Sequence, residues 1–178
     1  IEVYTKRDVD ELMILDVDQS KEGTTEPDLF SITDFVRSCN VPLTYGGGIA
    51  SVEDAINVIQ AGADKILLNT HQYLNKKLIS ELALRLGSQA VVAGIDARRL
   101  NETTHVTYSH CGTIEQDVSP TEAAKIAESE GAGEIVITSI DRDGTLEGYD
   151  LELISKITDT VRVPVIASGG AKDDNCFV

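Results

Sequence analysis

Short runs of aliphatic and β-branched residues recur along the chain, each followed by polar residues or glycine and then by a segment with helical periodicity. Runs this short and this apolar are typical of buried parallel strands. The pattern predicts six strands, at residues 11–17, 41–45, 65–68, 90–95, 134–138 and 163–167. Their alternation with helices indicates a parallel sheet built from βα units.

Helix start and stop signals fill the intervals between these strands. Asp28 and Asp150 are suited to cap a helix, and Ser51 with Asp54 three residues later resembles a capping box. The predicted helices cover residues 28–39, 51–62, 76–87, 119–131 and a segment that starts at 151. Alternation in residues 103–109 predicts an excursion hairpin after the fourth strand.

One half of the chain resembles the other at an offset of about 122 residues. Residues 28–32 match residues 150–154, residues 41–48 match 163–170, and Asp18 corresponds to Asp141. A repeat this long is not a solenoid unit, and it indicates two copies of a half-barrel.

Even βα spacing together with this repeat favours an α/β (β/α)₈ TIM barrel over a doubly wound sheet. A closed barrel needs eight strands and about 250 residues. We therefore expect residues 1–178 to form a single partial barrel domain with about six of the eight βα units. The sequence starts in what we interpret as the end of a helix, residues 1–8, and it is expected to be truncated at both ends.

Composition excludes several classes of protein. A net charge of −15 argues against a nucleic-acid or anionic-membrane surface. The sequence contains no apolar run of 18 residues, so we expect neither a membrane span nor a signal peptide. Three unpatterned cysteines favour the reduced cytoplasm, and the three histidines lack a metal-ligand spacing. We expect no metal and no cofactor.

The segment 138–150 lies where the fifth strand gives way to a helix. It carries the hydroxyl of Ser139 and the carboxylates of Asp141 and Asp143, followed by Gly144. Chemistry in α/β folds is done at the carboxyl ends of the strands, which makes this a candidate site. An ordinary Asp/Gly turn is the alternative interpretation.

Glycines follow the second and sixth strands, at 46–48 and 168–170. Glycine lets backbone N–H groups approach a phosphate, so Gly48, Gly169 and Gly170 are candidate phosphate ligands. The alternative interpretation is that these glycines only form tight βα turns. Asn69 and Thr70 end the strand beside the first loop, and residues 144–145 follow the strand beside the second. A substrate with a phosphate at each end would span the mouth of the barrel.

Asp96 follows the fourth strand, next to the strand that leads to Asp141 and Asp143. Neighbouring carboxylates suit general acid–base catalysis, because one charge raises the pKa of the other. Solvated carboxylates, or carboxylates paired with Arg98 or Arg142, are the alternative.

Glu11, Lys65 and Glu134 each begin a predicted strand, so in a barrel they would surround its bottom opening. Charges there usually form a stable, solvated rim. A gate is the functional alternative.

These motifs resemble the cyclase-subunit family of imidazole glycerol phosphate synthase, an enzyme of histidine biosynthesis. The matching segments are residues 15–16, 45–49, 62–65, 69–70, 87–92, 95–97, 131–135, 138–150 and 167–171. The resemblance implies a lyase that joins ammonia to a bisphosphorylated ribulosyl aminoimidazole carboxamide ribotide. The implied products are imidazole glycerol phosphate and aminoimidazole carboxamide ribotide. It also implies a glutaminase partner that docks at the barrel bottom and supplies the ammonia.

The resemblance assigns roles to individual residues. It makes Asp96 one of two catalytic aspartates, the other lying on a strand that precedes this sequence. It places Gly48, Asn69 and Thr70 in one phosphate site, and Gly144 and Gly170 in the other. It implies that Glu11, Lys65 and Glu134 are three of four gate residues for ammonia, and that Asp64 contacts the glutaminase.

Two alternatives remain open. Asp18 and residues 26–28 resemble a paralogous branch that is thought to channel ammonia into amidino-sugar synthesis for surface polysaccharides. The chain could instead be an inactive fragment or a glutaminase-binding scaffold. On the expected truncation, the 178-residue chain alone is predicted to be inactive.

Overall fold

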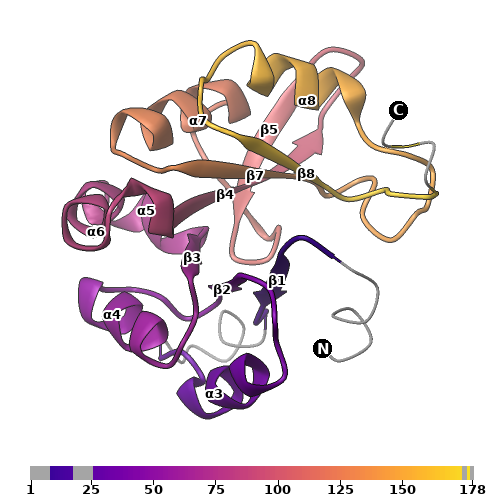
Figure 1. Cartoon of the computed structure of the whole chain (residues 1–178). Coiled ribbons are helices and arrows are strands. Elements are labelled where there is room, and N and C mark those ends of the chain that lie inside the picture. Colours follow the sequence, from indigo (N-terminus) through magenta and orange to yellow (C-terminus); the bar gives the residue numbers. More distant parts are fainter. Residues whose placement is uncertain (1–8, 18–25, 174–175, 177–178) are drawn as a thin grey trace.

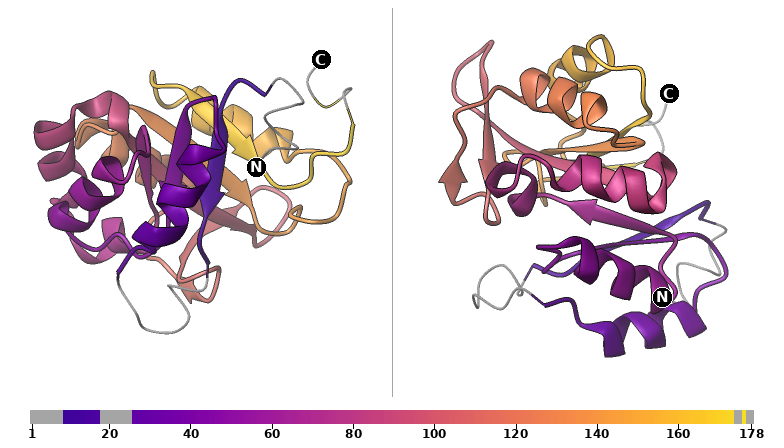
Figure 2. Two further views of the ribbon diagram at one scale, coloured as in Figure 1. Left: turned by 60° about the horizontal axis from the view of Figure 1, so that its bottom comes forward. Right: turned by 90° about the vertical axis from the view of Figure 1, so that its left-hand side faces the viewer.

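The computed structural model describes residues 9–17, 26–173 and 176. The helix end expected at residues 1–8, and Asp18, lie outside these ranges. A curled sheet runs through the molecule, and its helices cover one side of it (Figure 1). Figure 2 shows the same arrangement from two further directions.

Six parallel strands form the sheet in the order β1-β2-β3-β4-β7-β8, and a hairpin extends from β4. The strands are β1 (Leu12–Leu15), β2 (Leu43–Gly46), β3 (Lys65–Leu68), β4 (Val91–Arg99), β5 (His105–Ser109), β6 (Ile114–Glu115), β7 (Glu134–Ser139) and β8 (Val165–Ser168). Within the described ranges, β1 and β8 each pair on one side only, so the sheet is curled and partly open. This agrees with the predicted incomplete TIM barrel.

Helices follow the strands as the βα pattern predicts. They are α3 (Leu29–Arg37), α4 (Val52–Gln60), α5 (Thr70–Leu74), α6 (Leu78–Leu86), α7 (Pro120–Ser129) and α8 (Leu151–Thr158), with a 3₁₀ turn at η1 (Ser88–Ala90). The capping box of Ser51 and Asp54 is present and fixes the start of α4. Helix α5 was not predicted, since five residues are too few to show a helical period.

The helix caps in the two halves have the same geometry. Asp28 caps α3 with φ −77° and ψ 83°, and Asp150 caps α8 with φ −79° and ψ 84°. Each carboxylate accepts the N–H three residues later, from Ser31 and from Leu153. These positions lie at the offset of the sequence repeat, so the two helices start in the same way.

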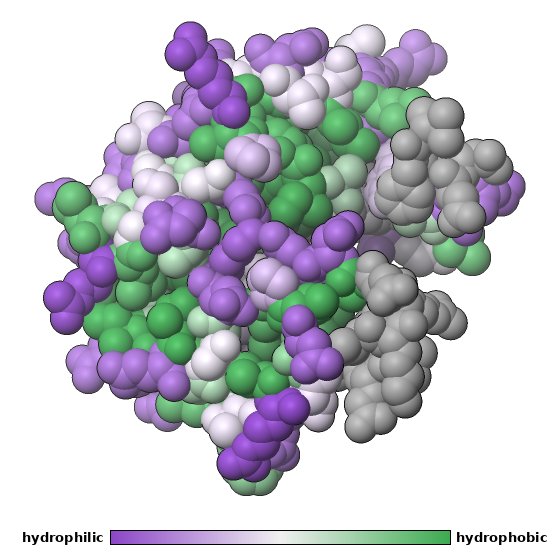
Figure 3. Space-filling view, viewed as in Figure 1, coloured by the Kyte–Doolittle hydropathy of each residue, from purple (hydrophilic) through white to green (hydrophobic). Residues whose placement is uncertain are grey.

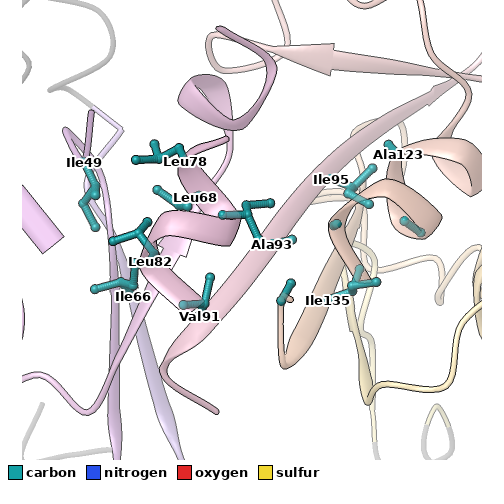
Figure 4. Close-up of a cluster of buried hydrophobic side chains, with 14 of the residues drawn as sticks. Ile49, Ile66, Leu68, Leu78, Leu82, Val91, Ala93, Ile95, Ala123 and Ile135 are labelled. Atoms are coloured by element: carbon teal, nitrogen blue, oxygen red, sulfur yellow. The ribbon is translucent and has the colours of Figure 1, made fainter. Parts of the chain in front are cut away.

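The core lies between the outer face of the sheet and the helices (Figure 4). Alternate residues of each strand point to this face, as the pleat requires. On β3 and β4 these are Ile66, Leu68, Val91, Ala93 and Ile95, all buried, and they pack with Leu78 and Leu82 of α6. The remaining strand residues therefore face the concave, inner side, where the candidate site lies.

Strand β4 is longer than predicted. It continues to Arg99 because β5 pairs with its second half in antiparallel register, Asp96 opposite Tyr108 and Arg99 opposite His105. Asp96 consequently lies inside the strand, whereas the sequence had suggested that it follows the end of the strand. The predicted hairpin is confirmed, and its buried residues alternate along β5.

Apolar residues are exposed where the sheet is open. Leu15, Val17 and Ile166 are 46%, 49% and 36% exposed. Figure 3 shows hydrophobic residues scattered among hydrophilic ones on the face seen in Figure 1. The concave side of the sheet is thus accessible at its two open edges.

Candidate active site

A cavity of about 140 Å³ opens at the carboxyl ends of β1, β2, β3 and β4. Four of the predicted site residues line it, namely Gly48, Asn69, Thr70 and Asp96. They come from three neighbouring strands, so the parallel sheet brings together residues that are far apart in the chain. Asp16 and Thr138 also line the cavity, which places polar groups on opposite sides of it.

Asp96 points to the inner face of β4, between Asn69 and Thr138. Burial raises the pKa of its carboxyl to about 6, and hydrogen bonds from Asn69 and Thr138 offset only part of that rise. The negative charge of Asp143 adds a smaller increase. Arg98 instead lies over the Tyr108 ring and donates to the Gly112 carbonyl. Burial, more than a paired carboxylate, therefore sets this pKa near neutrality.

The first glycine loop packs tightly against the end of β1. Gly47 has φ +131°, and a Cβ there would lie 2.5 Å from the Asp16 carbonyl oxygen. Gly48 has φ +67°, and a Cβ there would approach the backbone of Glu26 to 3.0 Å. Glycine is required here for close backbone approach, and Gly47 and Gly48 line the cavity wall.

Thr70 contributes a hydroxyl at the cavity edge. Its Oγ1 accepts the backbone N–H of His110, at 3.0 Å, which leaves the hydroxyl proton available to a ligand. His71 lines the cavity next to it, and burial, followed by the nearby His110, lowers the pKa of its imidazole.

The second predicted phosphate site is built from the loops after β7 and β8. The Gly148 N–H donates to the Gly170 carbonyl at 2.7 Å. A Cβ on Gly169 would lie 2.6 Å from the Ser139 carbonyl oxygen, so these loops are also in close contact. Gly144 is exposed with open space around it. These residues do not line the cavity of Asp96 and lie beside it along the sheet edge.

Ser139, Asp141 and Asp143 were predicted to support catalysis, and the structure separates them. Ser139 is buried outside the cavity, and its carbonyl accepts from Asp143 N–H in the turn that follows β7. The Asp141 carboxylate accepts the Arg99 N–H at 2.5 Å and so ties this turn to β4. Asp143 is exposed and acts on Asp96 through its charge.

Glu11, Lys65 and Glu134 meet at the opposite ends of the strands. Lys65 Nζ lies 2.9 Å from Glu11 Oε2 and 2.6 Å from Glu134 Oε1, and its side chain is 15% exposed. Burial alone would lower the pKa of Lys65, but its hydrogen bonds to Glu134 and Glu11 outweigh that effect and raise it. Lys65 thus bridges β1 and β7 across the concave face, which requires a strongly curled sheet.

Asp64, the predicted partner contact, is exposed next to this ion cluster. Its Oδ2 accepts the Leu43 N–H at 2.8 Å, which fixes the turn that leads into β3.

An apolar layer separates the ion cluster from Asp96. Leu67, Val92 and Val136 form this layer on the inner face, and Met13 packs against them. Along β7 the layer lies between Glu134 and Thr138, which are four residues or about 13 Å apart. The inner face therefore carries charges at the bottom, apolar side chains in the middle and Asp96 at the top.

Among the cavity residues that sequence reasoning missed are Asp16 and Thr138. The Tyr45 hydroxyl donates to Asp16 Oδ2 at 3.5 Å, and Thr138 hydrogen-bonds Asp96. The alternation of side chains along a strand could have revealed Thr138. It lies two residues after Val136 and four after Glu134, so all three point to the same inner face.

Neither a metal site nor a membrane span is found in the described ranges. They contain no cluster of three or more His, Cys, Asp or Glu side chains arranged to hold a metal ion. No helix among them is both long and apolar enough to cross a membrane.

The curled parallel sheet, with a cavity at the carboxyl ends of its strands, defines the TIM-barrel class of α/β proteins. Comparison with known proteins assigns the family within that class. The chain belongs to the family of histidine biosynthesis proteins, whose family model matches residues 1–177.

Three curated relatives, each named imidazole glycerol phosphate synthase subunit HisF, show the extent of the similarity. The protein of Sulfurisphaera tokodaii is 40% identical over 94% of this chain and 67% of its own length. That of Bacillus cereus is 42% identical over 95% of the chain and 67% of its length. That of Hyphomonas neptunium is 40% identical over 94% and 66%. The chain spans about two thirds of the length of these relatives.

Proposed function

We propose that this chain is the cyclase part of an imidazole glycerol phosphate synthase, acting in histidine biosynthesis. It would use glutamine-derived ammonia to convert a bisphosphorylated ribulosyl aminoimidazole carboxamide ribotide to imidazole glycerol phosphate and aminoimidazole carboxamide ribotide. The observation that carries the proposal is the layered inner face, with the Lys65 ion cluster at one end and Asp96 at the other. The names of the relatives support the same reaction.

Asp96 is proposed as a general acid–base. Ring closure with ammonia requires proton transfers to and from the reacting atoms. A carboxyl with a pKa of about 6 is present in both protonation states near neutral pH, so it can donate or accept a proton in turn. Asn69 and Thr138 would orient it through their hydrogen bonds.

The two ends of the substrate are proposed to bind the two glycine-rich loops. Gly48, Asn69 and Thr70 would hold one phosphate, through backbone N–H groups, an amide and a hydroxyl. Gly144, Gly169 and Gly170 would contribute to the site for the other. With a net charge of −15, attraction of an anionic substrate must come from such local donors and not from the field of the whole protein.

Ammonia is proposed to enter at the ion cluster. A glutaminase subunit would dock at the bottom face, beside Asp64, and release ammonia at Glu11, Lys65 and Glu134. The apolar layer above them favours passage of neutral ammonia over ammonium, because an unpaired charge is poorly solvated there. Ammonia would then reach Asp96 as the free nucleophile.

Steady-state turnover of the full-length gene product tests the proposal. The bisphosphate substrate is supplied with ammonium salt, or with glutamine and the glutaminase subunit, and both products are quantified. We expect turnover with either nitrogen source, and a loss of about 10²–10⁴-fold in Asp96→Asn with ammonium. Wild-type protein that forms neither product would refute the proposed reaction, and an Asp96→Asn variant within about threefold of wild type would refute the role of Asp96.

A further inference from the structure

The hairpin that extends β4 is anchored at both ends to different parts of the candidate site. It consists of the second half of β4, with β5 and β6 (Figure 1). Its turn, at residues 100–104, is hydrogen-bonded to Lys156 of α8, whereas the segment after β5 returns to the cavity. Both anchors consist of specific hydrogen bonds, so the hairpin is held on two sides.

The first anchor is a cluster of charges around Asp150. The Nη2 atom of Arg99 lies 2.7 and 2.8 Å from the two carboxylate oxygens of Asp150, and His105 Nε2 lies 3.0 Å from Oδ2. Asp150 and His105 have side chains only 4% and 3% exposed. Burial alone would raise the pKa of Asp150, but hydrogen bonds from Arg99 and His105 lower it to about 2. The Asp150 carboxylate is therefore ionised and closely paired with Arg99 at physiological pH.

This cluster joins the hairpin to the loop that carries Gly144. Asp150 closes that loop and caps α8, and Asp141 within the loop accepts the Arg99 N–H. Glu152 strengthens the junction, with Oε2 2.9 Å from Arg99 Nη1 and Oε1 2.6 Å from Lys156 Nζ. Lys156 in turn donates to the Thr103 carbonyl in the hairpin turn.

The second anchor joins the hairpin to the other proposed phosphate site. His110, directly after β5, donates its N–H to Thr70 Oγ1 at 3.0 Å, and its Nδ1 lies 2.8 Å from Ser109 Oγ. Cys111 Sγ approaches the Val17 carbonyl at 3.5 Å, at the end of β1. Both His110 and Cys111 have positive φ, 50° and 54°, so the chain is held in an unfavourable conformation at this contact.

We propose that the β4–β5–β6 hairpin is a brace that fixes the distance between the two phosphate subsites. Arg99, Asp150 and His105 hold its end at the Gly144 loop, and the His110 contact holds its end at Thr70. These are positioning residues, because they act on the subsites through the hairpin. The inference rests on the proposed function, in which one substrate occupies both subsites at once.

Rigid spacing matters only for a ligand that spans both sites. The second phosphate of such a ligand binds intramolecularly, with an effective concentration that depends on how well the ligand matches the span. A loosened brace lowers that effective concentration and weakens binding of the bisphosphate. A single phosphate, bound at one subsite, gains nothing from the spacing and should be unaffected.

Asp150→Asn releases the brace with little change in shape. The amide oxygen can still accept the Leu153 N–H and cap α8, since Asn is as good a cap as Asp, but the charge that holds Arg99 and His105 is gone. Asp28→Asn is the matched control, because Asp28 caps α3 with the same backbone geometry and its carboxylate accepts hydrogen bonds from the N–H and the hydroxyl of Ser31. Arg99→Lys is a second variant, which keeps the positive charge but loses the two-oxygen contact.

The test measures the dissociation constants of inorganic phosphate and of the bisphosphorylated substrate by calorimetry, on the full-length gene product without ammonia. For Asp150→Asn and Arg99→Lys we expect bisphosphate binding to weaken about tenfold or more, and phosphate binding to change less than about twofold. The Asp28→Asn control should leave both constants unchanged. Thermal melts establish that each variant is folded.

Two adverse outcomes are distinguishable. Wild-type protein that binds the bisphosphate no more tightly than phosphate would overturn the proposed function, and the brace with it. A wild-type preference for the bisphosphate that survives in both variants, or parallel losses for both ligands, would overturn the brace alone.

Discussion

Replacing Asp96 with Asn should stabilise the protein at neutral pH. The wild-type carboxylate is ionised above its pKa, yet it lies in a cavity wall that disfavours the charge. Asn has nearly the same shape, carries no charge and can take part in hydrogen bonds with Asn69 and Thr138. The substitution therefore removes the cost of ionisation and leaves the packing of β4 unchanged.

The magnitude follows from the shift in pKa from 3.8 to about 6. A shift of this size means that ionising Asp96 costs roughly 3 kcal/mol more in the folded protein than in the unfolded chain. This value is the upper limit for the stability that Asp96→Asn can gain. The folded state binds the proton more tightly than the unfolded chain. The contribution of Asp96 to wild-type stability should thus fall as pH rises from about 4 to about 6, and it should stay constant above that pH. At pH 8 the upper limit corresponds to a melting temperature about 6–12 °C higher in the variant.

The assay is urea or thermal unfolding of wild type and Asp96→Asn at pH 4, 6 and 8. The difference between them should be small at pH 4 and should grow through pH 6. Asp143→Asn is the control, because Asp143 is an exposed loop carboxylate, and its stability should stay within about 0.5 kcal/mol of wild type. If Asp96→Asn is equally or less stable than wild type at pH 8, the carboxylate is not held in a disfavoured ionised state and the reasoning fails.

Three further predictions concern other parts of the fold. Lys65→Ala leaves two carboxylates without their cation, so in the full-length gene product with its glutaminase, glutamine-dependent turnover should fall well below ammonium-dependent turnover. Equal losses in both assays would argue against a gate. Gly47→Ala should destabilise the protein by more than about 1 kcal/mol in urea unfolding, because its Cβ would meet the Asp16 carbonyl, whereas Gly144→Ala, which has open space, should cost less. Similar losses of stability in the two variants would show that the positive φ of these glycines, and not the space around them, determines the cost. Asp150→Asn should flatten the loss of stability as pH falls from about 4 towards 2, since the pKa of Asp150 is held at about 2 and its stabilising effect is lost on protonation. A melting temperature that falls as much in the variant as in wild type over this pH range would contradict this.

The fold was predictable because its signals are local and periodic. Each βα unit carries a short apolar run, and residues such as Asp28, Ser51 and Asp150 cap the helices that they were expected to cap. Glu11, Lys65 and Glu134 were expected to gather because each begins a strand, and the ion pairs of Lys65 join them.

The details that sequence alone left out depend on tertiary pairing. Asp96 lies within β4 because β5 folds back and extends the strand, which no local signal at residues 96–99 indicates. Likewise, Arg99, His105 and Asp150 share no motif, and only the antiparallel register of β4 and β5 brings them together. The position of Ser139 outside the cavity was also not predictable, because a hydroxyl next to a carboxylate motif says nothing about which face of the strand it occupies.

Isotope tracing tests the central claim most directly, namely that ammonia enters at the Lys65 cluster and reacts beside Asp96. The full-length gene product and its glutaminase are supplied with amide-¹⁵N glutamine, the bisphosphate substrate and an excess of unlabelled ammonium. If ammonia passes along the inner face, the imidazole product should be strongly enriched in ¹⁵N despite the unlabelled pool, and Lys65→Ala should reduce the enrichment. Product whose labelling matches the bulk ammonium in wild type would contradict the account.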